Sequence, residues 1–168
     1  ALGTALLVGA FGGVFNGVLV AYAGLSAFVA TLGTLTIFSG LALLVSNGKT
    51  IFGRAIPEIV GDFSRGGFPL AEEIQLPNLT LIGILVLILM GIVLQHTVFG
   101  RNLHAVGGNR EASMLAGVPV ARLRLIAFAV NGTGAAIAGL MLVSRLSSAN
   151  PTQGDGLMLN AIASVFVG

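Results

Sequence analysis

The stretch from Thr97 to Leu125 reads TVFGRNLHAVGGNREASMLAGVPVARLRL and is a long polar interval in an otherwise apolar half of the chain. It separates two hydrophobic runs, at about 79–95 and 126–144. Runs of about 17 to 25 apolar residues are long enough to cross a bilayer as helices. This arrangement predicts two membrane spans joined by a loop at one membrane face.

A short helix is expected inside this loop. Asn109 is suited to cap free N–H groups of a first turn, and Glu111 carries the negative charge that the positive end of a helix dipole favours. Residues 110–116 contain no helix breaker, Gly117 suits the position after the C-cap, and Pro119 follows as a stop. Because a helix of about two turns is not stable alone in water, we expect it to dock on the rest of the protein or on a partner.

Composition predicts an integral membrane protein. Hydrophobic residues make up 55% of the 168 and charged residues 8%, whereas an ordinary globular domain has roughly 25% charged residues. No charge precedes Lys49, and none lies between Glu73 and Arg101. With so little charge, the net charge of +2 indicates no nucleic-acid partner.

We therefore predict an all-α, polytopic helical bundle with about four full spans and the start of a fifth. The expected spans are residues 2–22, 27–45, 79–95 and 126–144, with a further apolar stretch at 157–168. Both ends of the chain lie inside apolar runs, so we interpret residues 1–168 as an internal fragment of one transmembrane domain.

Small residues in the first span are predicted to pack against another helix. Gly9, Gly13 and Gly17 recur every fourth position, and alanines continue the same register at both ends. On a helix this spacing forms one groove that a second helix can approach closely.

A few polar side chains lie inside the expected spans and are candidates for a solute route: Asn16, Thr31, Thr34 and Asn131. Two interpretations of the threonines remain open, because their hydroxyls can bond back to the preceding turn or face a pathway. For Asn16 an interhelical hydrogen bond is favoured over contact with a solute. No expected span contains Asp, Glu, Lys or Arg, so a neutral polar solute fits better than an ion.

The sequence offers no enzyme site. His96 and His104 lie eight residues apart with no carboxylate cluster nearby, and the chain has no cysteine. Gly48, Lys49 and Thr50 end like a phosphate-binding loop, but Leu43 stands where that motif needs glycine. We expect no catalytic residue, metal or cofactor.

Arginine and lysine counts give the orientation. The 97–125 loop carries four, whereas the 47–77 loop carries three together with four acids. This difference favours 97–125 as the cytoplasmic loop and 47–77 as the periplasmic one. Residues 56–63, IPEIVGDF, are expected to form a brief amphipathic turn that caps the bundle or docks a partner.

Several stretches in one order resemble bacterial ABC-importer permeases of the ribose/xylose/galactose type. They are FGRNLHAVGGNREASMLAGVPVARLRLIAF at 99–128, GGVFNGVLVAYAGLSAFVATLGTLTIFSGLALL at 12–44, AGL at 138–140, and NPTQGDG followed by LNAIA at 150–163. The resemblance covers nearly the whole chain. It differs at Ser26, where the family often has proline, at Ser113, where it has alanine, and at 158–163, where two acids are missing.

The resemblance implies a permease subunit that imports a monosaccharide by alternating access. It implies a dimer with a second permease copy, a periplasmic sugar-binding protein and a separate cytoplasmic ATP-binding subunit, all at the bacterial inner membrane. The short loop helix would be the coupling helix that contacts the ATP-binding subunit, through Asn109, Arg110, Glu111, Ala112, Ser113 and Gly117.

Two alternatives remain. The same architecture could carry a nucleoside, a small signalling sugar or a branched-chain amino acid. Alternatively, the protein could be a passive channel or a structural membrane subunit without an ATP-binding partner.

Overall fold

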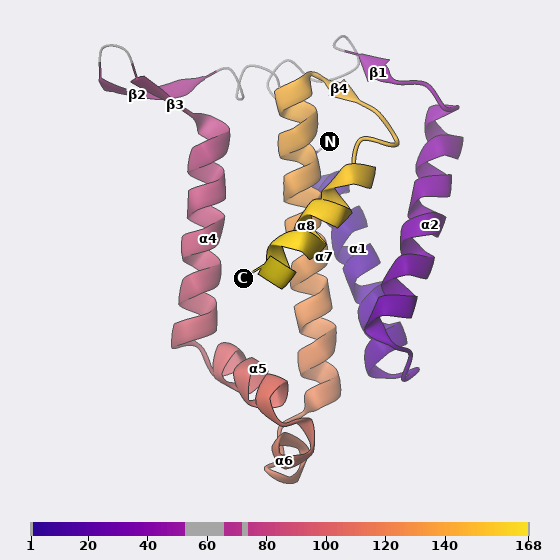
Figure 1. The fold of residues 1–168 in the computed structure, drawn as a ribbon, viewed down its shortest axis with the longest axis vertical. Helices are drawn as coiled ribbons and strands as arrows, with labels where there is room; N and C mark the ends of the chain where they lie inside the picture. Colours follow the sequence, from indigo (N-terminus) through magenta and orange to yellow (C-terminus); the bar gives the residue numbers. More distant parts are fainter. Residues whose placement is uncertain (1, 53–65, 72–73, 168) are drawn as a thin grey trace.

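The computed structural model describes residues 2–52, 66–71 and 74–167, and it is an all-α bundle (Figure 1). Its four long helices are α1 (Leu2–Ala21), α2 (Ala27–Ser46), α4 (Asn78–His96) and α7 (Val120–Leu146). Each is long and apolar enough to cross a membrane. The predicted all-α polytopic fold with four full spans is confirmed.

Shorter elements join these helices. Two lie between α4 and α7, namely α5 (Val98–Gly108) and α6 (Arg110–Leu115), and α8 (Asp155–Val167) follows α7. The strands β1 (Ile51–Phe52) and β4 (Ser148–Ala149) pair antiparallel, as do β2 (Gly67–Ala71) and β3 (Ile74–Pro77).

The elements collect at two opposite ends of the bundle. The α1–α2 turn lies with α5 and α6 at one end, called here the α6 end, and the four strands lie at the other, called the strand end (Figure 1). The β1–β4 pair connects the segment after α2 to the segment after α7. Successive long helices thus alternate in direction, as membrane spans must.

Glycines allow α1 and α7 to touch backbone to backbone, which is the most extensive helix contact in the fold. A Cβ at Gly9 would lie 2.5 Å from the Ala136 Cβ, and one at Gly13 would overlap the Phe128 carbonyl oxygen. At Gly17 a Cβ would lie 3.1 Å from the Leu125 Cα. The small-residue stripe of the first span therefore faces α7.

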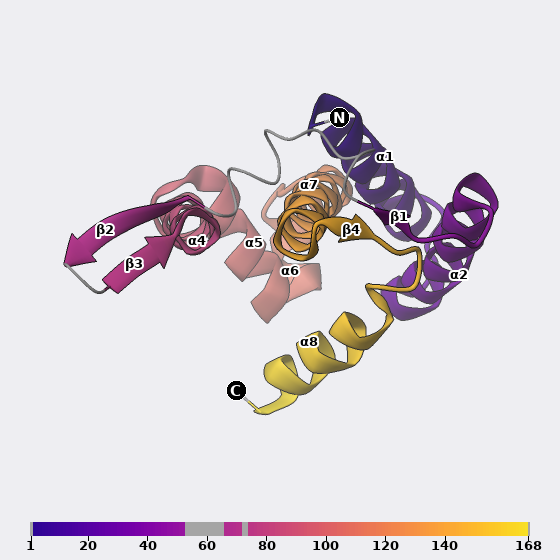
Figure 2. The ribbon, with the colours of Figure 1, turned by 90° about the horizontal axis from the view of Figure 1, so that it is seen from above.

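The remaining helices are loosely attached. From above, α7 stands between α4 and the α1–α2 pair (Figure 2). No residue of α4 is buried, and the buried apolar residues among those described are Val20, Ala30, Val120 and Leu123. A soluble protein could not leave so many large apolar side chains uncovered, whereas lipid or further helices can cover them.

Several local features differ from the sequence-based expectations. The fourth span begins at Val120, six residues earlier than predicted, so its first turns lie in the expected loop. The α5 helix and the short strands were not predicted. Residues 56–63, expected to form an amphipathic turn, lie outside the described residues.

The structure also changes the number of basic residues counted at each end of the bundle. Arg145 lies near the end of α7, at the strand end. Together with the three basic residues of 47–77, it makes four, equal to the four of the 97–125 stretch. The count of basic residues therefore does not orient this chain in the membrane.

Candidate functional site

Two regions of the structure gather the residues singled out in the sequence, the α6 helix and a pocket among α1, α2 and α7. The approach to α6 is a tight bend between α4 and α5. Thr97 caps α5 by accepting a hydrogen bond from the Gly100 N–H at 3.2 Å. A Cβ at Gly100 would overlap the Leu94 carbonyl, so α5 can fold back on α4 only with glycine there.

Helix α6 is capped at both ends. The Asn109 side chain accepts a hydrogen bond from the Ala112 N–H at 3.0 Å. At the other end, the Gly117 N–H donates to the Met114 carbonyl and the Val118 N–H donates to the Ser113 carbonyl, both at 3.0 Å. This pair of bonds is a Schellman motif, and its left-handed residue is Gly117 with φ +80°.

Most of α6 faces outward. Arg110, Glu111 and Ala112 are exposed, whereas Ser113 is buried and its hydroxyl donates to the Asn109 carbonyl at 2.8 Å. Leu115 is 91% exposed and Met114 is 56% exposed. Met114 and Leu115 were not predicted as site residues, although two apolar side chains on an otherwise polar loop helix are visible in the sequence.

The second region is a pocket of about 700 Å³ between α1, α2 and α7. Of the four residues proposed for a solute route, it brings together Asn16, Thr31 and Asn131. Thr34 is not among its lining residues. Gly9, Gly13 and Gly132 also line it, so the pocket lies beside the tight α1–α7 contact.

Thr34 instead links two helices beside this pocket. It is 4% exposed, and its hydroxyl donates to the Asn16 Oδ1 at 2.8 Å. The Thr31 hydroxyl bonds back to the carbonyl of Ala27 at 2.8 Å. Thr31 thus has the features of both interpretations, because its hydroxyl bonds to its own helix and its side chain also lines the pocket.

The pocket has a defined chemical character. Its lining contains no Asp, Glu, Lys, Arg or His, and its polar side chains are Asn16, Asn131 and Thr31. Within the described residues, the N–H₂ groups of both asparagines form no hydrogen bond. The arrangement can offer neutral donors and acceptors to a hydroxyl-bearing solute but no countercharge to an ion.

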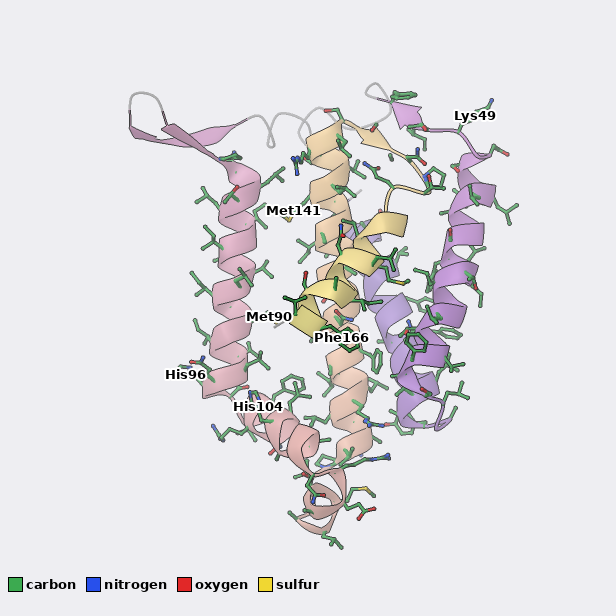
Figure 3. The ribbon with its side chains drawn as sticks, viewed as in Figure 1. Lys49, Met90, His96, His104, Met141 and Phe166 are labelled. Carbon is green, nitrogen blue, oxygen red and sulfur yellow. The ribbon has the colours of Figure 1, made fainter. Side chains whose placement is uncertain are left out.

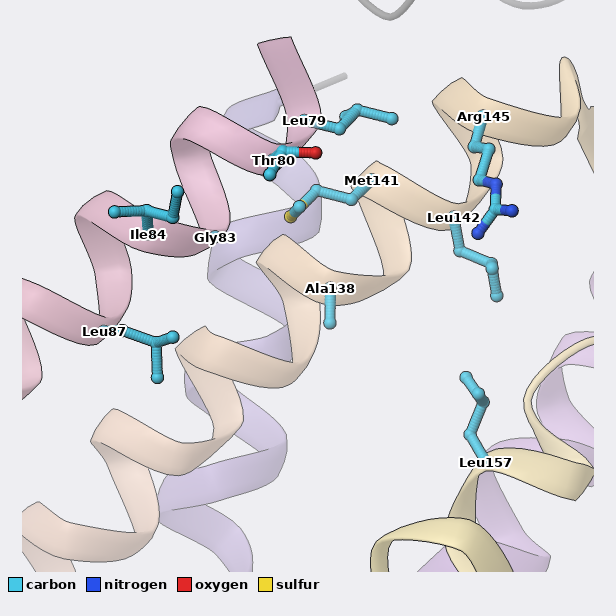
Figure 4. A pocket seen from close by; sticks show the side chains of 10 residues that line it. All are labelled: Leu79, Thr80, Gly83, Ile84, Leu87, Ala138, Met141, Leu142, Arg145 and Leu157. Carbon is cyan, nitrogen blue, oxygen red and sulfur yellow. The ribbon is translucent and has the colours of Figure 1, made fainter. Parts of the chain in front are cut away.

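A smaller pocket of about 490 Å³ lies between α4, α7 and α8 (Figure 4). Met141 from α7 and Thr80 from α4 point into the gap between these helices, and Arg145 lies at its edge. The other lining residues are apolar or glycine. It has fewer neutral hydrogen-bonding groups than the α1–α2–α7 pocket.

The two histidines belong to separate helices. His96 ends α4 and His104 lies on α5, both towards the α6 end, whereas Lys49 lies at the strand end (Figure 3). In the part of the chain that the structure describes, no three potential metal ligands come together.

A bundle of apolar spans with a neutral pocket between three of them and a capped helix at one end is the architecture of a multi-pass membrane protein. The chain belongs to the family described as branched-chain amino acid transport system / permease component, whose model matches residues 1–168.

Curated relatives narrow the class. The chain is 37% identical over 153 residues to the ribose import permease protein RbsC of Bacillus subtilis, covering 91% of this chain and 46% of the relative. It is 37% identical to the L-arabinose transport system permease protein AraH of Escherichia coli, covering 91% and 44%. It is 36% identical to the autoinducer 2 import system permease protein LsrC of Yersinia pseudotuberculosis, covering 98% and 45%. The chain spans about half the length of these relatives, and no solved structure matches it.

Proposed function

We propose that this chain is part of a permease subunit that imports a monosaccharide across the bacterial inner membrane by alternating access. ATP would be hydrolysed by a separate cytoplasmic subunit, and the permease itself would have no catalytic site. Residues 1–168 would form one transmembrane domain, with 97–125 cytoplasmic and 47–77 periplasmic.

The exposed face of α6 is the observation that carries the energy-coupled part of the proposal. Leu115 is 91% exposed on a short helix at the tip of the α6 end. Burying a leucine side chain contributes roughly 1.5 to 3 kcal/mol, so an uncovered one on a capped, well-defined helix favours a protein partner. Arg110 and Glu111 beside it would add polar contacts, and the partner would be the ATP-binding subunit.

The chemistry of the α1–α2–α7 pocket supports a neutral cargo. A zwitterionic amino acid would need countercharges for its ammonium and carboxylate groups in an apolar setting. The pocket lining has none. Asparagine amides and a threonine hydroxyl suit the hydroxyl groups of a sugar, in line with the ribose and arabinose named for the relatives.

Orientation and assembly complete the proposal. With the α6 end in the cytoplasm, the strand end would receive sugar from a periplasmic binding protein. The entirely unburied α4 fits a surface that lipid, the rest of the subunit or a second permease copy covers.

Uptake measurements test this function. The full-length subunit, expressed with its proposed ATP-binding and solute-binding partners, should accumulate one of radiolabelled ribose, arabinose, xylose or galactose in an ATP-dependent manner. It should not accumulate leucine. Leucine accumulation, or equilibration of a sugar without ATP, would overturn the proposal.

A further inference from the structure

A third pocket, at the α6 end, has two arginines in its lining. It has a volume of about 280 Å³ and is lined by residues of α1, α2, the turn between them, α6 and α7. They are Val20, Ala21, Gly24, Leu25, Ser26, Ala27, Arg110 and Arg124. It therefore lies where the α1–α2 turn meets α6 and the first turns of α7.

Among the described residues, the two arginines in this pocket have no acidic partner. Neither forms an ion pair within the described part of the chain. Glu111 is the one acid in sequence between Glu73 and Asp155, and it is not among the lining residues. Two guanidinium groups that share a small pocket repel each other, so an anion between them would be stabilised.

The backbone beside the two arginines also favours an anion. Ser26 is the N-cap residue of α2 but forms no side-chain cap hydrogen bond. The first N–H groups of α2 therefore carry partial positive charge with no Ser26 side-chain oxygen to satisfy them, and Ser26 and Ala27 at this end of α2 line the pocket. A phosphate is the anion that best matches arginines and helix N–H groups together.

The surroundings favour an amphiphile over a free ion. Tyr22 is 61% exposed and Phe28 is 66% exposed, one on each side of the α1–α2 turn. Both adjoin spans whose outer faces are apolar. Helix α7 has 27 residues, which is about 40 Å, longer than the roughly 30 Å of hydrocarbon in a bilayer. Its first turns, with Arg124, therefore fit the headgroup level.

We propose that this pocket binds the phosphate of an acidic phospholipid, with Arg110 and Arg124 as the cationic ligands. The lipid bridges α6, α7 and the α1–α2 turn, and its acyl chains lie along the exposed apolar residues beside the turn. A phosphate group fits, because the pocket volume of about 280 Å³ is many times the roughly 10–15 Å³ that a cavity needs to hold one water. The inference needs that the α6 end meets a membrane surface. Arg110 also belongs to the face proposed for the ATP-binding subunit, so the test uses Arg124, which does not.

Native mass spectrometry of the purified full-length subunit tests this site. Phosphatidylglycerol and phosphatidylcholine with the same acyl chains would be added in turn, and the retained lipid counted. The wild-type protein should retain phosphatidylglycerol in preference, and Arg124→Gln should lower that retention about fivefold. Arg124→Lys keeps the positive charge and should retain part of the phosphatidylglycerol. This variant keeps the test decisive if Arg124→Gln misfolds.

Matched controls identify the site. Arg122→Gln changes an exposed arginine two residues away on α7 that does not line the pocket, and Arg101→Gln changes one on α5. Both should retain phosphatidylglycerol as the wild type does. An equal loss in Arg122→Gln and Arg124→Gln, or equal retention of the two lipids by the wild type, would overturn the proposal.

A competition arm separates the two sources of phosphate. Inorganic phosphate at millimolar concentration should leave the bound phosphatidylglycerol in place. If inorganic phosphate displaces the lipid and stabilises the protein to heat as well as the lipid does, the pocket takes free phosphate and the lipid proposal is wrong. These readouts involve neither transport nor ATP hydrolysis, so they can fail while the proposed import function stands.

Discussion

Glycine has two different roles in this chain, and the space around each residue distinguishes them. Gly9, Gly13 and Gly132 lie where an added Cβ would meet backbone or side-chain atoms of the facing helix. Gly40, also inside a long helix, has nothing within 4 Å of such a Cβ. The four-residue spacing indicated a packing face, but the partner helix could not be predicted, because spacing carries no information on which span comes near.

Gly13→Ala should weaken the α1–α7 contact. Its Cβ would overlap the Phe128 carbonyl, and such overpacking costs about 1 to 3 kcal/mol. We expect a clearly lower thermal unfolding temperature of the purified full-length protein. Gly40→Ala is the control and should be neutral or slightly stabilising, because alanine favours helix there. Equal stability of the two variants would contradict the close contact.

Thr34→Val tests the link between α1 and α2. Removing the Thr34 hydroxyl breaks the 2.8 Å bond to Asn16, and such bonds between membrane helices contribute about 0.6 to 1.7 kcal/mol. Thr36→Val is matched to it, because the Thr36 hydroxyl bonds only to its own helix, at the Gly33 carbonyl. In thermal unfolding of the purified protein, Thr34→Val should be less stable than Thr36→Val; the reverse order would be inconsistent with the interhelical bond.

Among the elements, α6 illustrates what local sequence can specify. Its cap at Asn109 and its left-handed Gly117 depend on neighbouring residues alone, so both were visible in the sequence. The α5 helix was missed because three glycines in Val98–Gly108 weaken any helix prediction. The β1–β4 pair joins residues about a hundred positions apart, and no local pattern indicates such pairing.

Asn109→Ala should loosen α6. The asparagine cap contributes about 0.5 to 2 kcal/mol, and alanine cannot accept the Ala112 N–H. Amide hydrogen exchange over residues 110–116 of the full-length protein should become faster. Asn109→Asp keeps an acceptor and should protect these amides as well as asparagine does. Unchanged exchange in the alanine variant would mean that contacts other than the cap hold the helix.

At the scale of the whole molecule, the sequence predicted the number of spans and the family but not the arrangement. Composition suffices for spans because a bilayer demands long apolar helices. Arg145 was not included when the basic residues of the two loops were counted. It is assigned to the strand end by the direction of α7. The pocket that joins Asn16, Thr31 and Asn131 depends on three helices meeting, which only the fold reveals.

Asn131→Leu should impair uptake through the α1–α2–α7 pocket. The change removes neutral donors and an acceptor that line the proposed solute pocket, and we expect about tenfold lower uptake efficiency. Thr133→Val is its control, because the Thr133 hydroxyl bonds back to the Val130 carbonyl at 2.7 Å and is not among the pocket-lining residues. Membrane insertion should be equal in both variants. A greater loss in Thr133→Val would place the route elsewhere.

The most direct test of the account is to map where the ATP-binding subunit contacts the permease. A photocrosslinking amino acid would replace Leu115 in the full-length protein, and in a second protein it would replace Phe52, which is 71% exposed at the strand end. The account predicts a crosslink to the ATP-binding subunit from position 115 and none from position 52. An intact complex that crosslinks from position 52 and not from position 115 would contradict it.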